Sequence, residues 1–160
     1  MASEAGTALH VICFGNELHG DDGFGPAVRA RLAAAALPAG VRLMRAALAG
    51  LAAIACFEGC AQAIIVDAVQ GFGPPGSLHE LDASSIAADA AANEARAGFH
   101  GAGVGSLLQL LPAALERVPA IRLVGVEAGH IQAFAPGLSV AVAAAVEMAA
   151  AHIIARWAPR

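Results

Sequence analysis

The stretch 15–25, with the sequence GNELHGDDGFG, constrains the fold of this chain more than any other part. It contains four glycines, which let a backbone adopt positive φ angles and approach a ligand closely. It also holds the three carboxylates of Glu17, Asp21 and Asp22, with His19 among them. Negative charges crowded in this way favour a nearby metal ion or a basic partner.

This stretch joins a predicted strand to a predicted helix. Residues 10–14, which precede it, form a short apolar run that is typical of a buried strand. Residues 26–36, which follow it, begin with Pro26, and proline is favoured in the first turn of a helix. A strand that leads into a helix through a glycine-rich turn is common at the functional sites of α/β proteins.

The rest of the chain continues to alternate between the two kinds of element. Further strands are predicted at 41–45, 63–66, 77–81 and 120–126, and further helices at 51–60, 104–115 and 139–157. The pattern predicts an α/β fold: a three-layer sandwich with a mostly parallel, twisted sheet of about five strands and helices on both faces.

Three of these segments, and the stretch 83–96 between them, carry more specific expectations. Strand 41–45 alternates apolar and basic residues, which indicates a place near the sheet edge, and strand 77–81 is a candidate for antiparallel pairing. Ser139 is a candidate N-cap for the last helix. Residues 83–96 are alanine-rich with scattered acids, and two interpretations stay open for them: a loose helix or a mobile segment.

Composition limits the possible functions. A length of 160 residues suits a single domain spanning 1–160. The net charge of −4, without a basic stripe, argues against a nucleic-acid partner. The longest apolar run, 138–151, is interrupted by Glu147 and consists mostly of alanine and valine, so we expect no membrane span. The N-terminus has no basic region before its first apolar run, so no signal peptide is indicated.

Residue types that are missing exclude further classes. All nine cations are arginines, and the absence of lysine excludes a Walker-type phosphate loop and Schiff-base chemistry. The three cysteines, at 13, 56 and 60, are typical of reduced cytoplasmic thiols, and we read them as buried small residues.

Three side chains are candidates for a common site. Asp67 directly follows the strand 63–66, Asp22 follows the first strand, and His100 precedes a predicted helix. In a parallel sheet, ligands lie beyond the carboxyl ends of the strands, so these residues could converge there. Two carboxylates and an imidazole suit a divalent transition metal. The alternatives are a helix cap for Asp22 or His100 and a turn role for Asp67.

Several segments together resemble the hydrogenase maturation protease family. The opening VICFGNELHGDDGFGP at 11–26 is similar to the family's first motif, and IIVDAV at 64–69 to its second. A third motif, a histidine before small residues and a helix, resembles HGAGVGSLL at 100–108. The strand 123–127 and the helix entry 136–139 also fit.

The resemblance implies an activity. Members of this family are endopeptidases that trim the C-terminus of the large subunit of nickel-iron hydrogenases, so the implied partner is a large-subunit precursor. By motif, the family's catalytic and metal-contacting residues fall on Asp22, Asp67 and His100. The implied metal is nickel already held in the precursor, and no tightly bound cofactor of the protease itself is expected.

The sequence also departs from the family pattern. Many relatives have an Asp-Gly-Gly-Thr-like segment after the second strand, whereas this chain has RAALAG at 45–50. The lost acid and hydroxyl keep open the alternative of an inactive protease homologue. A second alternative is a non-catalytic α/β module that binds a metal or a nucleotide, although the acids among the glycines of 15–25 would repel phosphate.

Overall fold

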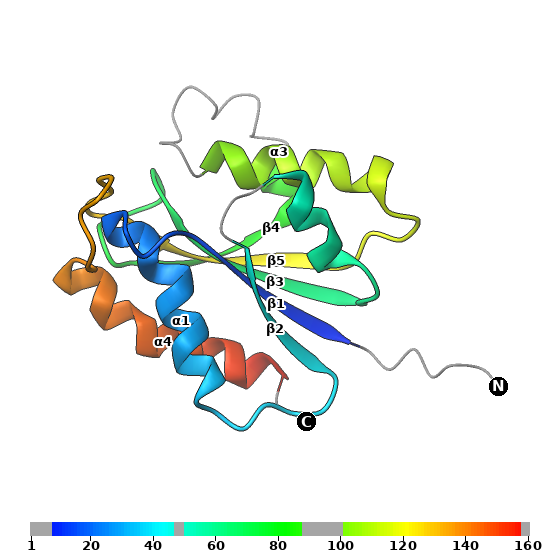
Figure 1. The fold of residues 1–160 in the computed structure, drawn as a ribbon, viewed down its shortest axis with the longest axis horizontal. Coiled ribbons are helices and arrows are strands. Elements are labelled where there is room, and N and C mark those ends of the chain that lie inside the picture. The colour runs from blue at the N-terminus through cyan, green and yellow to red at the C-terminus, as the bar shows by residue number, and fades with distance from the viewer. Residues whose placement is uncertain (1–7, 47–49, 88–100, 158–160) are drawn as a thin grey trace.

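The computed structural model describes residues 8–46, 50–87 and 101–157, which form a five-stranded sheet with helices against it (Figure 1). The strands are β1 (Leu9–Phe14), β2 (Val41–Ala46), β3 (Gln62–Val69), β4 (Leu78–Asp82) and β5 (Ala120–Glu127). Their order in the sheet is β2-β1-β3-β5-β4. All neighbours are parallel except β4 and β5, which are antiparallel. The predicted α/β class, the edge position of β2 and the antiparallel strand are confirmed.

Helices cover both faces of the sheet. They are α1 (Phe24–Ala33), α3 (Gly101–Ala114) and α4 (Val140–Trp157), with short 3-10 helices η1 (Gly20–Gly23) and η2 (Leu51–Phe57). Helices α1 and α4 lie together on one face, and α3 and η2 lie on the other (Figure 1). No helix in the described ranges is both long enough and apolar enough to cross a membrane.

Two apolar cores fill the space between these layers. Successive side chains of a strand point to opposite faces, so β3 contributes Ile64 and Val66 to the core under α1 and α4. Its residues Ala63 and Ile65 belong to the core under α3 and η2. Because β3 is buried on both faces, its sequence is a continuous apolar run and not an alternating one.

The observed boundaries differ from the expected ones in a few places. Helix α1 begins at Phe24 and ends at Ala33, so it is displaced towards the glycine-rich stretch. The segment predicted as a helix at 51–60 is a 3-10 helix that ends at Phe57. Residues 83–87 are helical, and the remainder of 83–96 lies outside the described residues.

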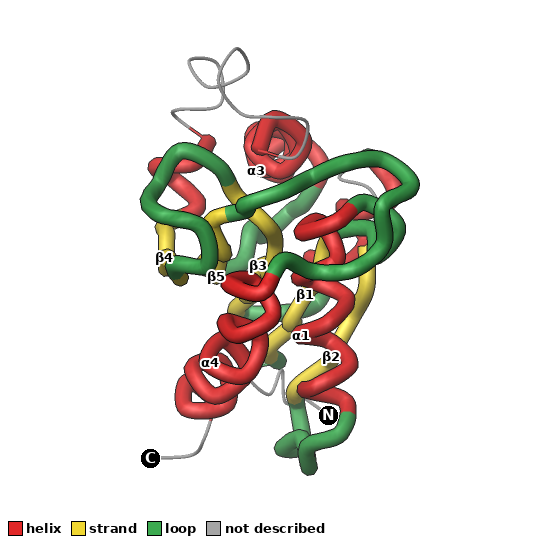
Figure 2. The backbone as a smooth tube through the Cα atoms, turned by 90° about the vertical axis from the view of Figure 1, so that its left-hand side faces the viewer, coloured by secondary structure: helices red, strands yellow, loops and turns green. Residues whose placement is uncertain are grey.

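The loops after β1, β3 and β5 meet at one edge of the sheet, which we call the carboxyl edge. They lie at the left of Figure 1 and face the viewer in Figure 2. The backbone N–H of Gly20 donates to the carbonyl of Ala135 over 2.8 Å, and His19 forms a β-bridge with the same residue. The glycine-rich stretch is therefore joined to the loop between β5 and α4.

Candidate active site

Asp22 lies in η1 at the carboxyl edge, and its side chain is buried. Its Oδ2 accepts a hydrogen bond from the backbone N–H of Asn16 over 2.9 Å. Gly15 permits this tight loop, because a Cβ atom there would lie 2.0 Å from the carbonyl oxygen of Asp22. The N-cap position of α1 is Gly23 and has no side-chain cap, so Asp22 does not serve as the cap of that helix.

Asp67 lies within β3, two residues before its end, on the face that carries Ile65 and Val69 towards α3. Its side chain is 3% exposed, and its Oδ1 accepts the backbone N–H of Ala68 over 2.8 Å. Burial, with a further contribution from the charge of Asp22, raises the pKa of Asp67 well above its usual range. The two carboxylates are therefore close enough for each charge to act on the other.

His100, the third candidate, lies outside the described residues. Helix α3 begins at the next residue, Gly101, and this end of the helix is at the carboxyl edge (Figure 1). Within the described ranges, no group of three histidine, cysteine or acidic side chains is arranged to hold a metal. The structure thus brings together Asp22 and Asp67, and the place of His100 stays a prediction.

Asp21 has a role that the sequence did not reveal. Its buried carboxylate accepts backbone N–H groups from Gly129, His130 and Ser139 over 2.7–2.8 Å, and the hydroxyl of Ser139 over 2.9 Å. Burial works to raise its pKa, but these hydrogen bonds outweigh burial and lower it. Asp21 therefore binds the η1 turn to the loop before α4, and it is not a cap of α1.

Ser139 was expected to cap α4, and it does precede the first residue of that helix. Its hydroxyl, however, donates to Asp21. This acceptor lies 118 residues away in the chain, so no local signal in the sequence indicated the bond.

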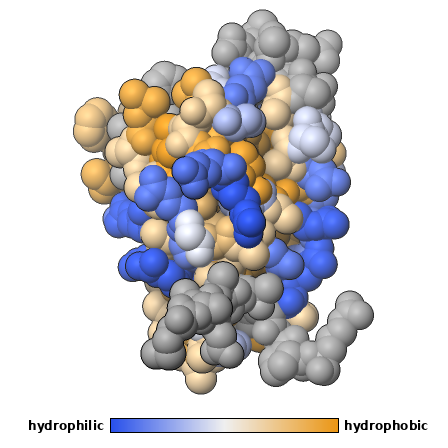
Figure 3. Space-filling view, turned by 90° about the vertical axis from the view of Figure 1, so that its right-hand side faces the viewer, coloured by the Kyte–Doolittle hydropathy of each residue, from blue (hydrophilic) through white to orange (hydrophobic). Residues whose placement is uncertain are grey.

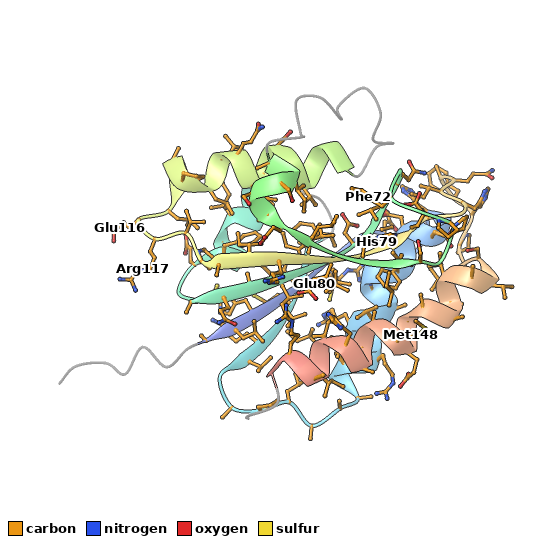
Figure 4. All side chains as sticks on the ribbon, turned by 180° about the vertical axis from the view of Figure 1, so that it is seen from behind. Phe72, His79, Glu80, Glu116, Arg117 and Met148 are labelled. Atoms are coloured by element: carbon orange, nitrogen blue, oxygen red, sulfur yellow. The ribbon has the colours of Figure 1, made fainter. Side chains whose placement is uncertain are left out.

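Glu127, at the end of β5, is buried at the same edge. Its two carboxylate oxygens accept the backbone N–H groups of Gly71 and Phe72 over 2.8 and 3.0 Å. Phe72 is 45% exposed and lies at this end of the molecule (Figure 4). Glu127 thus fixes the loop between β3 and β4.

The segment that departs from the family pattern begins with a charged contact. Arg45, on β2, donates to Oε2 of Glu17 in the glycine-rich stretch over 2.5 Å. Both side chains are more than 40% exposed, so solvent weakens the pair. Residues 47–49 of this segment lie outside the described residues.

The cysteines do not offer a nucleophile. Burial raises the pKa of the Cys13 thiol to about 12, with a smaller contribution from Asp67 that Arg29 opposes. Burial also raises the pKa values of Cys56 and Cys60. A nucleophilic cysteine needs the opposite shift, since the thiolate is the reactive form.

A serine and a histidine lie close together but do not form a nucleophilic pair. Ser77 Oγ is 2.8 Å from Nε2 of His79 and donates its own proton to the carbonyl of Pro74 over 2.7 Å. Its oxygen is left to accept from His79, so the imidazole cannot take the hydroxyl proton, as a general base would. The acids at the carboxyl edge are the better candidates for catalysis.

Comparison with known proteins assigns this chain to a family. The sequence profile of the family described as "Hydrogenase maturation protease" matches residues 26–156. The chain belongs to the hydrogenase maturation protease family. Its activity is accordingly that of an endopeptidase that processes the C-terminus of a hydrogenase large subunit. A sequence search of curated proteins gives no significant match.

Solved structures have the same fold over nearly the whole chain. The maturation protease HybD from Thermococcus kodakarensis is 25% identical, with a TM-score of 0.74 over 95% of this chain and 99% of its own. The hydrogenase 2 maturation peptidase from Thaumarchaeota archaeon SCGC_AB-539-E09 is 28% identical, with a TM-score of 0.66 over 93% and 97%. The maturating endopeptidase HybD from E. coli is 24% identical and, with a TM-score of 0.80 over 93% and 91%, shares the fold.

Proposed function

We propose that Asp22, Asp67 and His100 are the residues that contact nickel in the large-subunit precursor, and that cleavage follows only when nickel is present. The observation that carries this proposal is the buried pair of interacting carboxylates, Asp22 and Asp67, at the carboxyl edge. Such a pair is unfavourable when both groups are ionised, and a divalent cation relieves the repulsion.

The raised pKa of Asp67 gives the free enzyme a way to remain stable without a metal. A proton on Asp67 removes one of the two negative charges and with it the repulsion between the two groups. Nickel carried by the precursor replaces that proton when the two proteins meet. The metal is then part of the substrate, which makes the pair a sensor of nickel insertion.

Peptide hydrolysis at this site needs a proton acceptor and polarisation of the scissile carbonyl. Water adds its oxygen to the carbonyl carbon, one water proton goes to a base, and the leaving nitrogen takes up a proton as the C–N bond breaks. In this proposal a carboxylate of the pair serves as the base, and the nickel of the precursor would supply Lewis acidity. The buried cysteines and the Ser77–His79 contact are not used.

We also propose that residues 1–160 form one domain in the cytoplasm. Helices α1 and α4, from the two ends of the chain, pack together under a single sheet, which supports the single domain. The three free cysteines support a reducing compartment.

The test uses a purified precursor with and without nickel. We expect intact mass spectrometry to show loss of a short C-terminal peptide only from the nickel-loaded form. The variants Asp22→Asn and Asp67→Asn should abolish that loss, while the matched control Glu80→Gln should retain it. Cleavage that survives both aspartate substitutions would refute the site, and no cleavage of any large subunit would identify an inactive homologue.

A further inference from the structure

Phe134, in the loop between β5 and α4, has an unusual conformation and exposure. It is the only non-glycine residue in the described part of the chain with a positive φ angle, 57°. Bulky side chains rarely adopt this region, because the Cβ atom crowds the following carbonyl. The ring is also 85% exposed. Neither backbone preference nor burial in the free protein accounts for a phenylalanine here.

The loop that carries Phe134 is held against the candidate active site. Asp21 binds both of its ends, through Gly129 and His130 on one side and Ser139 on the other. In between, the ring of Phe134 meets the edge of the His19 ring, with 6.1 Å between centroids and 75° between planes. The ring thus lies beside His19, in the stretch that leads into the turn of Asp22.

Two more exposed apolar side chains are sequence neighbours of residues that make these contacts. Leu18, next to His19, is 50% exposed, and Val140, next to Ser139, is 89% exposed. We call Leu18, Phe134 and Val140 the apolar rim. The sequence around Phe134 and Val140, 131–146, contains no charged residue, while Leu18 follows the exposed Glu17. Exposed apolar groups in an uncharged setting are typical of the centre of a protein–protein interface.

We propose that the apolar rim is the surface on which the hydrogenase large-subunit precursor docks, with Phe134 as the side chain that determines affinity. The substrate of this family is a protein, so the enzyme needs a protein-binding surface beside its acids. The rim is continuous with the turn of Asp22 through His19 and Ser139. This inference rests on the proposed function, since docking here delivers the precursor to Asp22 and Asp67.

The decisive variant is Phe134→Asn. Asparagine tolerates positive φ angles, so this substitution removes the ring and leaves the backbone unstrained. We expect the Tm to stay the same or rise, while KM for the nickel-loaded precursor rises about tenfold or more and kcat changes little. Phe134→Leu should restore part of the affinity. A residue with only a structural role would lower the Tm and would not affect KM alone.

Met148 provides the matched control. It is 61% exposed on α4 (Figure 4) and is not one of the rim residues. Met148→Ala removes an exposed apolar side chain, and alanine is a strong helix former, so α4 should stay intact and KM should be unchanged. An equal rise of KM in Met148→Ala and Phe134→Asn would overturn the proposal.

Binding measured without cleavage separates this inference from the site assignment. Asp22→Asn enzyme, immobilised for interferometry, should bind nickel-loaded precursor, and adding Phe134→Asn should weaken that binding about tenfold or more. Unchanged affinity in the double variant would overturn the docking surface even if Asp22 proves essential. Conversely, retained cleavage by Asp22→Asn would refute the site while the effect of Phe134 stands. If the wild-type protein is a dimer and Phe134→Asn makes it monomeric, the rim binds a second copy of this chain, and the proposal is overturned.

Discussion

The two edges of the sheet differ in which side chains are buried and which are exposed. At the carboxyl edge four acids are buried and large apolar groups are exposed, although Glu17 is an exposed acid there. The buried acids are Asp21, Asp22, Asp67 and Glu127, and the exposed apolar groups are those of the apolar rim. Towards the amino edge, which faces the viewer in Figure 3, charged groups are exposed around a cleft of about 280 Å³ with an apolar floor.

Glu80 illustrates the second arrangement. Its carboxylate accepts hydrogen bonds from Arg122 and Arg156, and lies 2.8 Å from Nε2 of His152. Burial works to raise its pKa, but the contacts with Arg156 and His152 outweigh burial and lower it. The pKa of Asp67 moves in the other direction because burial raises it and the charge of Asp22 raises it further. The cations beside Glu80 thus offset the effect of burial on its pKa, whereas the acid beside Asp67 adds to that effect.

The largest expected difference between the edges concerns activity. Asp22→Ala should reduce precursor cleavage about 100-fold or more, because it removes a charge from the proposed nickel contact. Glu80→Ala should leave cleavage within about twofold, since its ion pairs are distant from the chemistry. Timed intact-mass assays measure both rates. A similar loss in both variants would abolish the distinction between the edges.

The next effect concerns stability at the carboxyl edge. Asp21→Asn should lower the free energy of unfolding by about 2–4 kcal/mol, because an amide NH2 would face backbone N–H donors. The folded-state pKa of Asp21 lies below its unfolded value, so its contribution is present above the unfolded pKa and lost as pH falls through the folded pKa. Urea melts of both proteins at neutral and acidic pH should therefore differ most at neutral pH. Equal midpoints at neutral pH would show that the hydrogen bonds of Asp21 do not stabilise the fold.

The substitution Asp67→Asn should change stability in the opposite direction and stabilise the protein. The folded-state pKa of Asp67 lies above its unfolded value, so wild-type stability falls as pH rises through the folded pKa. The amide keeps the shape and the acceptor for Ala68 and cannot ionise. We expect the Tm of the variant to exceed that of wild type by a few degrees at pH 8, and the difference to shrink towards pH 4. A variant that is less stable than wild type at pH 8 would show that ionisation of Asp67 does not destabilise the fold.

The smallest effect belongs to the other edge. Glu80→Gln should reduce stability by less than about 1 kcal/mol, because the arginine and histidine side chains it contacts are 43–51% exposed. The difference should disappear in about 1 M salt, where surface charges are screened. A larger loss, or one that salt does not change, would place Glu80 among the buried structural acids.

Much of the fold could be predicted from local pattern. The apolar run of β3, the alternation of β2 and the helical spacing of α3 each reflect neighbours within a few residues, and each was confirmed. The boundaries were less predictable because contacts with the rest of the protein decide them, as in the 3-10 helix at Leu51–Phe57.

The sequence by itself determined the residue types at the carboxyl edge, since glycines, acids and strand ends are local facts and the motif order indicates the family. Only the tertiary structure decided what each acid does. Asp21 and Ser139 are 118 residues apart in the chain, so their hydrogen bonds arise from packing of α4 beside α1. Two further properties depend on the side chains that lie nearby in space: the raised pKa of Asp67 and the exposure of Phe134. The periodicity of the sequence does not indicate which side chains these are.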